Sequence, residues 1–205
     1  MAQHRPGHIT ASTVARFLTG KDPAKLLKGT ETAISELALE RLGICPDLAD
    51  YGFDGNAATE WGNEHEAEAI EAYQAETFTL DIHGQQDVIS SGSHLSCTPD
   101  GLISESGMLE TKCPYNPKIH FSYLLDKSAL RKEYYDQVQF QLWLSGRSYC
   151  DLVSYDPRFT VPHRLVIARI EPDQKWQEFA QIRIELVLDA VERIVNQFTQ
   201  NQTNP

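Results

Sequence analysis

The sequence is poor in cysteine, and its few cysteines are widely spaced. Four cysteines occur among 205 residues, at positions 45, 97, 113 and 150, and no two of them form a Cys-x-x-Cys pair. Zinc ribbons and iron–sulfur clusters need cysteines paired at short spacing, so the pattern excludes both kinds of site. In a cytosolic domain, thiols spaced in this way are expected to be reduced and buried in the core.

Long apolar runs and a signal peptide are also lacking. No stretch approaches the roughly 18 apolar residues of a membrane span, and no charged segment followed by an apolar one opens the chain. The length suits one domain with a sizeable core. We therefore expect a soluble cytoplasmic protein without a membrane partner, with one domain over residues 1–198 and a frayed polar tail over residues 199–205.

Two common enzyme motifs fail at the places where fragments of them occur. A phosphate-binding P-loop ending at Gly20-Lys21 would need glycine at position 15, which is alanine. A zinc-protease motif beginning at His65-Glu66 would need a second histidine at position 69, which is also alanine. The other histidines show no ligand spacing and are expected at the surface or in loops: His4, His8, His83, His94, His120 and His163.

Acidic residues outnumber basic ones, but the two kinds are unevenly distributed. The formal net charge is −11, from 29 Asp and Glu against 18 Lys and Arg. Residues 1–30 and residues 111–132 nevertheless each hold five basic residues and one acidic residue. A basic groove on an acidic body attracts a polyanion to one place and repels it elsewhere. Ordinary solvated faces would give the same clustering, so charge alone leaves a nucleic-acid partner open.

Apolar periodicity and turn residues predict an α/β fold. Helices are expected over residues 8–20, 30–43, 60–76 and 128–145, and a last helix opens at Glu171-Pro172-Asp173. Short strands are expected at Val88–Ser91, Leu95–Thr98, Gly101–Ser104, Met108–Cys113, Cys150–Tyr155 and Arg164–Ile170. This order predicts a mostly meandering sheet that helices interrupt and cover.

The helix expected over residues 60–76 carries one glutamate among its inward-facing residues. Glu66 shares the inward stripe with Ala69 and Ile70, whereas Glu64 lies on a polar face with two further glutamates. A buried carboxylate is unfavourable unless it is paired or binds a metal ion. Glu66 is therefore a candidate ligand.

The strongest chemical signal is a Pro99-Asp100 pair followed ten residues later by Glu110-Thr111-Lys112. In an extended strand, Glu110 and Lys112 project from one face, and Asp100 lies one hairpin earlier, where it can meet Glu110 across neighbouring strands. Two carboxylates, with Glu66 as a third, are oxygen ligands of the kind that bind Mg²⁺. The adjacent lysine could hold or deprotonate an attacking water. This is the PD-(D/E)xK pattern of metal-dependent nucleases, although a hairpin with an ordinary surface salt bridge would also produce it.

A further polar group lies on the helix expected over residues 128–145. This helix is apolar nearly all round, yet Tyr134, Gln137 and Gln141 share one of its faces. Buried amides and hydroxyls need hydrogen-bond partners. The face is therefore expected to meet another polar cluster.

Five sequence blocks follow one another in a fixed order. They are Arg5–Ser12, Trp61–Glu66, Cys97–Leu102 together with Gly107–Pro114, Tyr134–Gln139, and Tyr155–Arg158. In these blocks the chain resembles the phage-type alkaline exonucleases, the family of bacteriophage lambda exonuclease and the YqaJ-like viral recombinases. The resemblance covers positions 5 to 158, which is most of the chain.

The resemblance implies a fold and a set of site residues. The fold is the restriction-endonuclease-like mixed β-sheet flanked by helices. Asp100, Glu110 and the backbone carbonyl of Thr111 would bind two divalent ions, Mg²⁺ with Mn²⁺ as a substitute. Glu66 would complete the metal shell, and Lys112 would be the catalytic lysine. The pocket for the terminal 5′-phosphate would be formed by Arg5, Ser12, Thr98 and Gln137.

The resemblance also implies an activity. The expected protein is a 5′-to-3′ exodeoxyribonuclease that degrades one strand of linear double-stranded DNA from 5′-phosphorylated ends. Relatives form ring-shaped homotrimers and hand the remaining 3′ strand to a single-strand annealing recombinase, in the cytoplasm of the bacterial host of a phage or prophage. Three alternatives stay open: an endonuclease of the same fold, a catalytically silent scaffold that binds DNA ends, and a phosphodiesterase for small nucleotides.

Overall fold

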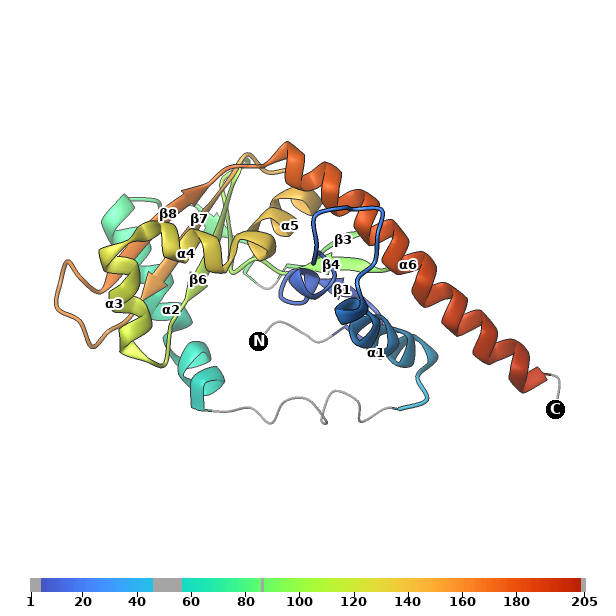
Figure 1. The fold of residues 1–205 in the computed structure, drawn as a ribbon. Helices are drawn as coiled ribbons and strands as arrows, with labels where there is room; N and C mark the ends of the chain where they lie inside the picture. Colours follow the sequence, from blue (N-terminus) through green and yellow to red (C-terminus); the bar gives the residue numbers. More distant parts are fainter. Residues whose placement is uncertain (1–4, 46–56, 86, 204–205) are drawn as a thin grey trace.

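The computed structural model describes residues 5–45, 57–85 and 87–203, and all bounds below refer to these residues. Within them the chain forms a mixed α/β fold with two β-sheets (Figure 1). No helix in these ranges is both long enough and apolar enough to cross a membrane.

Among the described residues, the larger sheet has five strands in the spatial order β2, β5, β6, β7, β8. Their bounds are β2 (Ile82–His83), β5 (Gly101–Ile103), β6 (Gly107–Lys112), β7 (Tyr149–Tyr155) and β8 (Leu165–Ile170). β6 and β7 pair in parallel, and the other neighbours pair antiparallel. β6 is the central strand: residues 107–109 pair with both neighbours, whereas Glu110, Thr111 and Lys112 pair with β7.

Different helices cover the two faces of the larger sheet. On one face, Leu109 of β6 packs with Ile70 of α2 (Ala57–Thr77). On the other, Met108 packs with Leu130 and Val138, because successive side chains of a strand point to opposite faces. The helices on this second face are α3 (Pro117–Leu125), α4 (Lys127–Glu133) and α5 (Tyr135–Ser145).

The smaller sheet has the order β1, β4, β3 and lies with the N-terminal helices and the last helix (Figure 1). The elements are β1 (Ile9–Thr10), β3 (Ile89–Ser91), β4 (Leu95–Cys97), η1 (Val14–Arg16), η2 (Lys28–Thr30), α1 (Glu31–Leu42) and α6 (Gln174–Thr203). Helices α1 and α6 pack together through Ile34, Leu37, Ile184 and Val187 in one core cluster.

Helix α5 lies between the two cores. Val138 and Leu142 belong to the core of the larger sheet, whereas Phe140 and Trp143 pack in the core of the smaller sheet. A helix buried on two sides is apolar nearly all round, which explains the composition of this segment. It also places the glutamines of α5 at the junction of the two halves of the fold.

The helix expected over residues 8–20 is wrong. Ile9 and Thr10 instead form β1, which pairs in parallel with β4, and a short helical turn follows only at η1. The Thr13 hydroxyl accepts a hydrogen bond from the Thr10 N–H at 3.0 Å. Such local side-chain bonds compete with helix formation. The pairing of Ile9 and Thr10 with β4 also holds these residues in an extended conformation.

Later expectations also need correction. The helix expected over residues 128–145 is divided into α4 and α5, which meet at Tyr134. Helix α3 was not predicted, although Asn116 caps it by accepting a hydrogen bond from the Lys118 N–H at 3.1 Å. Helix α6 includes the polar residues from 199 as far as Thr203, and residues 204–205 lie outside the described part.

The six expected strands are confirmed with shifts of about a residue at their ends, but they do not form one meander. β3 and β4 join β1 in the smaller sheet, and β6 and β7 are parallel. His120, expected at the surface or in a loop, is buried in α3. Its Nδ1 lies 2.8 Å from Ser154 Oγ and its Nε2 lies 2.9 Å from the carbonyl oxygen of His163, which gives it a structural role.

Candidate active site

The register of the β5–β6 hairpin brings two carboxylates together. Gly101 pairs with Leu109 across this hairpin, so Asp100 and Glu110, the next residue on each strand, lie opposite each other. The Asp100 carboxylate accepts hydrogen bonds from the Thr111 N–H at 2.6 Å and from the Thr111 hydroxyl at 2.8 Å. These bonds fix the carboxylate beside the end of β6.

Glu110 is buried, with 3% of its surface exposed, and its carboxylate accepts three hydrogen bonds from described residues. Oε1 accepts from Lys112 Nζ at 2.7 Å and from Gln137 Nε2 at 2.5 Å. Oε2 accepts from Gln141 Nε2 at 2.7 Å. The polar face of α5 therefore meets the acidic end of β6, and this contact compensates the buried charge.

The charges at the site are strongly coupled. Burial, together with the negative charge of Glu110, raises the pKa of Asp100 to about 8. Burial alone would lower the pKa of Lys112, but the charges of Glu110 and Asp100 outweigh that effect and raise it. The site thus holds one ammonium group beside an excess of carboxylate, an environment that an additional cation would stabilise.

Asp100, Glu110, Thr111 and Lys112 line a cavity of about 360 Å³, which we call the carboxylate–lysine cavity, and helix α2 brings Glu66 to it. Glu66 is half-buried, whereas Glu64, Glu68 and Glu71 are exposed. The predicted distinction between the glutamates of this helix is therefore confirmed.

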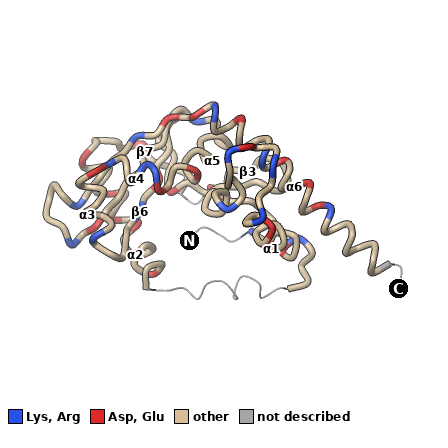
Figure 2. The backbone as a smooth tube through the Cα atoms, in the orientation of Figure 1, with Lys and Arg blue, Asp and Glu red and all other residues tan. Residues whose placement is uncertain are grey.

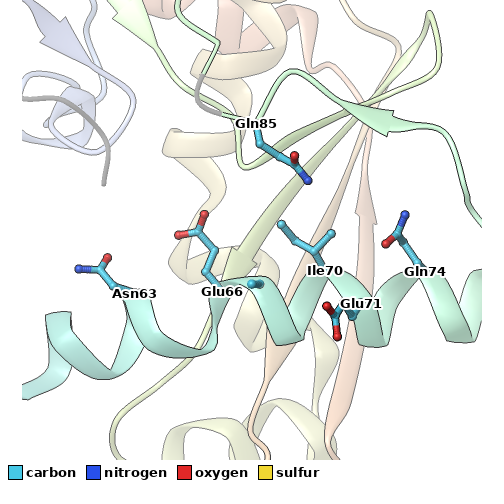
Figure 3. Close-up of a pocket in the computed structure, with 7 residues that line it drawn as sticks. Asn63, Glu66, Ile70, Glu71, Gln74 and Gln85 are labelled. Carbon is cyan, nitrogen blue, oxygen red and sulfur yellow. The ribbon is translucent and has the colours of Figure 1, made fainter.

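A second, open cavity of about 590 Å³ continues from the first along α2. Asn63 and Glu66 line both cavities. Figure 3 shows Asn63, Glu66 and Ile70 on the side of α2 that faces the segment carrying Gln85, while Glu71 points away from it. Glu66 therefore lies where the two cavities meet.

The four residues expected to bind a terminal phosphate also lie together. Arg5, Ser12, Thr98 and Gln137 line a cavity of about 220 Å³, which we call the end cavity. Three of them, Ser12, Thr98 and Gln137, also line the carboxylate–lysine cavity. The two cavities are thus adjacent, with Gln137 between them.

Two further side chains belong to the end cavity: Ser96, which the sequence left without a role, and Gln141, which it identified only as part of the polar face of α5. Both are 1% exposed and both line the cavity. Ser96 Oγ and Gln141 Oε1 have no hydrogen-bond partner among the described residues. Gln141 follows Gln137 by one helical turn, so its face could be predicted, whereas its contact with Glu110 depends on the tertiary fold.

Another residue that sequence reasoning left without a role is Arg158. Its guanidinium donates to the Pro114 carbonyl at 3.2 Å and to the Tyr115 carbonyl at 3.1 Å, just beyond Lys112. It also binds Asp156 at 2.7 Å and lies 4.3 Å from the centroid of the Trp61 ring of α2. Arg158 therefore ties the chain after β6 to the helix that carries Glu66.

The chain is similar to proteins of a known family. The family model described as "YqaJ-like viral recombinase domain" matches residues 2–148, more than half of the chain. The chain belongs to the YqaJ-like viral recombinase family. A comparison with curated proteins finds no match.

Solved structures agree with this assignment of the YqaJ-like domain. The chain superposes on the alkaline exonuclease (LHK-Exo) from Laribacter hongkongensis with a TM-score of 0.80 and 27% identity, over 97% of this chain and 95% of that chain. A second structure of that enzyme, in complex with dAMP, superposes with a TM-score of 0.79 and 27% identity, over 96% of this chain and 94% of that chain. A phage-related exonuclease from Haemophilus somnus 129PT shares the fold, with a TM-score of 0.76 and 16% identity, over 95% of this chain and 97% of that chain.

The donor set of this YqaJ-like domain can be tested against the divalent metal that the family implies. Among the described residues, no group of three or more His, Cys, Asp or Glu side chains is arranged to hold a metal ion. Mg²⁺ does not require such a group, because it keeps several waters and binds through one or two carboxylates together with substrate phosphates. Asp100 and Glu110 supply two carboxylates in one cavity with negative charge in excess. The donor set therefore fits Mg²⁺.

Proposed function

We propose that this protein is a Mg²⁺-dependent 5′-to-3′ exodeoxyribonuclease, which degrades one strand of linear double-stranded DNA from a 5′-phosphorylated end. The observation that carries the proposal is the adjacency of the two cavities, which share Ser12, Thr98 and Gln137. A site for phosphodiester hydrolysis next to a polar pocket for a terminal phosphate selects the first bond of a strand.

The carboxylate–lysine cavity would supply the chemistry. Asp100, Glu110, the Thr111 carbonyl and Glu66 would hold two Mg²⁺ ions, with Mn²⁺ as a substitute. When bound, such ions activate water as a nucleophile and stabilise the attacking and leaving oxygens. Lys112, whose raised pKa keeps it protonated in the free protein, orients the attacking water and stabilises negative charge on the phosphate.

The end cavity would bind the terminal 5′-phosphate. A terminal phosphate carries more negative charge than a phosphodiester, so a guanidinium with hydroxyl and amide donors favours the end of a strand. Arg5 supplies the guanidinium, Ser12 and Thr98 supply hydroxyls, and Gln137 supplies an amide. A 5′-hydroxyl end would leave these donors without their main acceptor.

The distribution of charge favours one approach for DNA. Figure 2 shows Lys and Arg positions in α3 and α4 and in the segment before α1, on a molecule with many acidic positions elsewhere. In α3 and α4, Lys118, Lys127, Arg131 and Lys132 are exposed. These side chains would contact the phosphate backbone and leave the acidic remainder to repel it.

The proposal also covers the assembly and the partner, for which the resemblance to the family is the support. The protein would act as a ring-shaped homotrimer and leave a 3′ strand for a single-strand annealing recombinase, in the cytoplasm of the host of a phage or prophage. The structure of the Laribacter alkaline exonuclease in complex with dAMP supports the reaction, because dAMP is a mononucleotide of the kind that an exonuclease releases.

The proposal is tested by Mg²⁺-dependent digestion of three DNA substrates: a linear duplex with 5′-phosphates, the same duplex with 5′-hydroxyls, and a covalently closed circle. We expect rapid loss of the first, slow loss of the second and an intact circle. Arg5→Ala should slow the phosphorylated duplex far more than the hydroxylated one. The matched control is Arg16→Ala, because Arg16 is already paired with Glu36.

Each contrary result has a defined meaning. Cutting of the circle would replace the exonuclease with an endonuclease of the same fold. Binding of DNA without digestion would indicate a catalytically silent scaffold that binds DNA ends. An equal effect of Arg5→Ala on both linear substrates would remove Arg5 from the end pocket.

A further inference from the structure

Glu110 is held by two glutamines that differ in their surroundings. Gln137 and Gln141 lie one turn apart on α5 and therefore on one face, and each donates to a different oxygen of the Glu110 carboxylate. Gln137 is half-buried and lines both cavities. Gln141 is 1% exposed and lines the end cavity.

This difference separates a contact that substrate can replace from one that it cannot. Under the proposed function, Gln137 donates its amide to the terminal phosphate, and its bond to Glu110 Oε1 is then broken or shared. The bond from Gln141 to Oε2 lies on the buried side of the carboxylate and does not compete with that phosphate. Glu110 would otherwise lose part of its support at the moment when DNA binds.

The orientation of the Gln141 amide is fixed by chemistry. The NH₂ group must face the Glu110 carboxylate, because the reverse orientation would set two acceptors against each other. Oε1 of the same amide is then the atom left without a partner among the described residues, in a side chain that lines the end cavity. A water or hydroxyl that orders in this cavity can donate to it, so one rigid amide joins the end cavity to Glu110.

We infer that Gln141 is a positioning residue, which holds Glu110 in the orientation seen here while Gln137 turns to the terminal phosphate. The inference rests on the proposed function for the role of Gln137. It assigns Gln141 to the support of a metal-binding carboxylate rather than to contact with DNA. Partners that orient metal ligands in this way commonly change metal affinity 10–100-fold, to order of magnitude, when they are replaced.

The helix itself supplies a matched control. Gln139 is 0% exposed on the same helix, and its amide is also fully used, donating to the Glu171 carbonyl and accepting from the Asp173 N–H, both at 2.8 Å. Replacement of Gln139 with methionine removes a buried amide without touching Glu110. It therefore reports the structural effect of losing such a group from α5.

The test measures Mn²⁺ binding without DNA, by titration calorimetry, for the wild type and for Gln141→Met, Gln137→Met and Gln139→Met. We expect Gln141→Met to raise the Mn²⁺ dissociation constant about tenfold or more and Gln139→Met to stay near the wild type. Gln137→Met should raise the dissociation constant less than Gln141→Met does, because Lys112 still donates to Glu110 Oε1 when Gln137 is replaced. Gln139→Met should instead lower the melting temperature. Gln137→Met should reduce the preference for 5′-phosphorylated over 5′-hydroxyl ends in digestion, a preference that Gln141→Met should keep when Mg²⁺ is saturating.

Gln141→Asn provides a second variant in case Gln141→Met does not fold, because it keeps a buried amide that is one methylene too short to reach Glu110. Equal Mn²⁺ affinity in Gln139→Met and in the folded Gln141 variant would overturn the inference. So would an equal loss of affinity in Gln137→Met and Gln141→Met. A wild type that binds Mn²⁺ but digests no DNA would overturn the proposed function alone, since the Mn²⁺ titrations stand without digestion.

Discussion

Lys112 supplies positive charge to the carboxylate–lysine cavity. Its ammonium lies 2.7 Å from Glu110 Oε1 and 4.8 Å from the centroid of the Tyr134 ring. Replacement with alanine removes the positive charge but leaves Glu110 bonded to Gln137 and Gln141. We expect Lys112→Ala to lower the hydrolysis rate by about 10²-fold or more, measured in single-turnover digestion, with DNA affinity little changed in a gel-shift assay.

Lys132→Ala is the control for this prediction, because Lys132 is an exposed lysine of the same basic segment. It should keep the wild-type rate at saturating DNA. A Lys112→Ala variant that hydrolyses DNA at the wild-type rate would remove this lysine from the chemistry.

Glu66 and Glu64 allow a paired comparison on one helix. Glu66 is half-buried in the carboxylate–lysine cavity, whereas Glu64 is exposed. Glu66→Gln removes one negative charge with little change of shape, so the Mg²⁺ concentration for half-maximal digestion should rise about tenfold. Glu64→Gln should leave that concentration unchanged. If the two variants behave alike, Glu66 has no place in the metal shell.

The sequence identified part of this site because short-range geometry determines it. The hairpin register places Asp100 opposite Glu110 once the two strands are recognised, and helical spacing puts Gln137 and Gln141 on one face. The acid that these amides meet could not be predicted, because that contact depends on how α5 packs against β6. The contact of Arg158 with Trp61 could not be predicted either, because it also depends on tertiary packing.

At the scale of elements, Arg158 adds a polar connection between α2 and the chain after β6, beside the apolar packing of Ile70 on Leu109. Its guanidinium lies against Trp61 of α2 and binds the carbonyls of Pro114 and Tyr115 after β6. Arg158→Lys keeps the charge but cannot form the planar, forked bonds of a guanidinium. We expect α2 and its Glu66 to be held less firmly, so the Mg²⁺ requirement should rise several-fold, as measured by digestion across a Mg²⁺ series.

Arg169 of β8 controls for the removal of a guanidinium in general. Arg169 binds Asp151 through two bonds of 2.8 Å and lies 3.9 Å from the centroid of the Tyr149 ring, without lining the carboxylate–lysine cavity. Arg169→Lys should lower thermal stability and leave the Mg²⁺ requirement unchanged. The same Mg²⁺ shift in both variants would mean that Arg158 acts only through stability.

The elements that sequence patterns predicted wrongly are those whose pairing partners lie far away in the sequence. Residues 8–20 have a helical pattern, yet Ile9 and Thr10 pair with β4, which lies far along the chain. Tertiary pairing of this kind overrides local preference. By contrast, the strands of the β5–β6 hairpin were predicted well because their partners are adjacent in sequence.

For the whole molecule, the decisive property is the separation of charge. A protein of net charge −11 can bind DNA only where basic side chains outweigh the acidic ones locally. The exposed lysines of α3 and α4 meet this condition and follow directly after the candidate active site along the chain. Binding through them should release counterions and therefore depend steeply on salt.

The double variant Lys118→Gln/Lys127→Gln tests this surface against a control with the same change of net charge, Lys175→Gln/Arg193→Gln on α6, where both residues are also exposed. DNA affinity is measured over a salt series. We expect the slope of log affinity against log salt to fall by about 0.9 for each DNA phosphate that the variant no longer neutralises, and only in the α3–α4 variant. Equal slopes in the two variants would mean that net charge, rather than this surface, governs binding. A reduced slope confined to the α3–α4 variant would place the DNA backbone on α3 and α4, the helices that follow Lys112 along the chain.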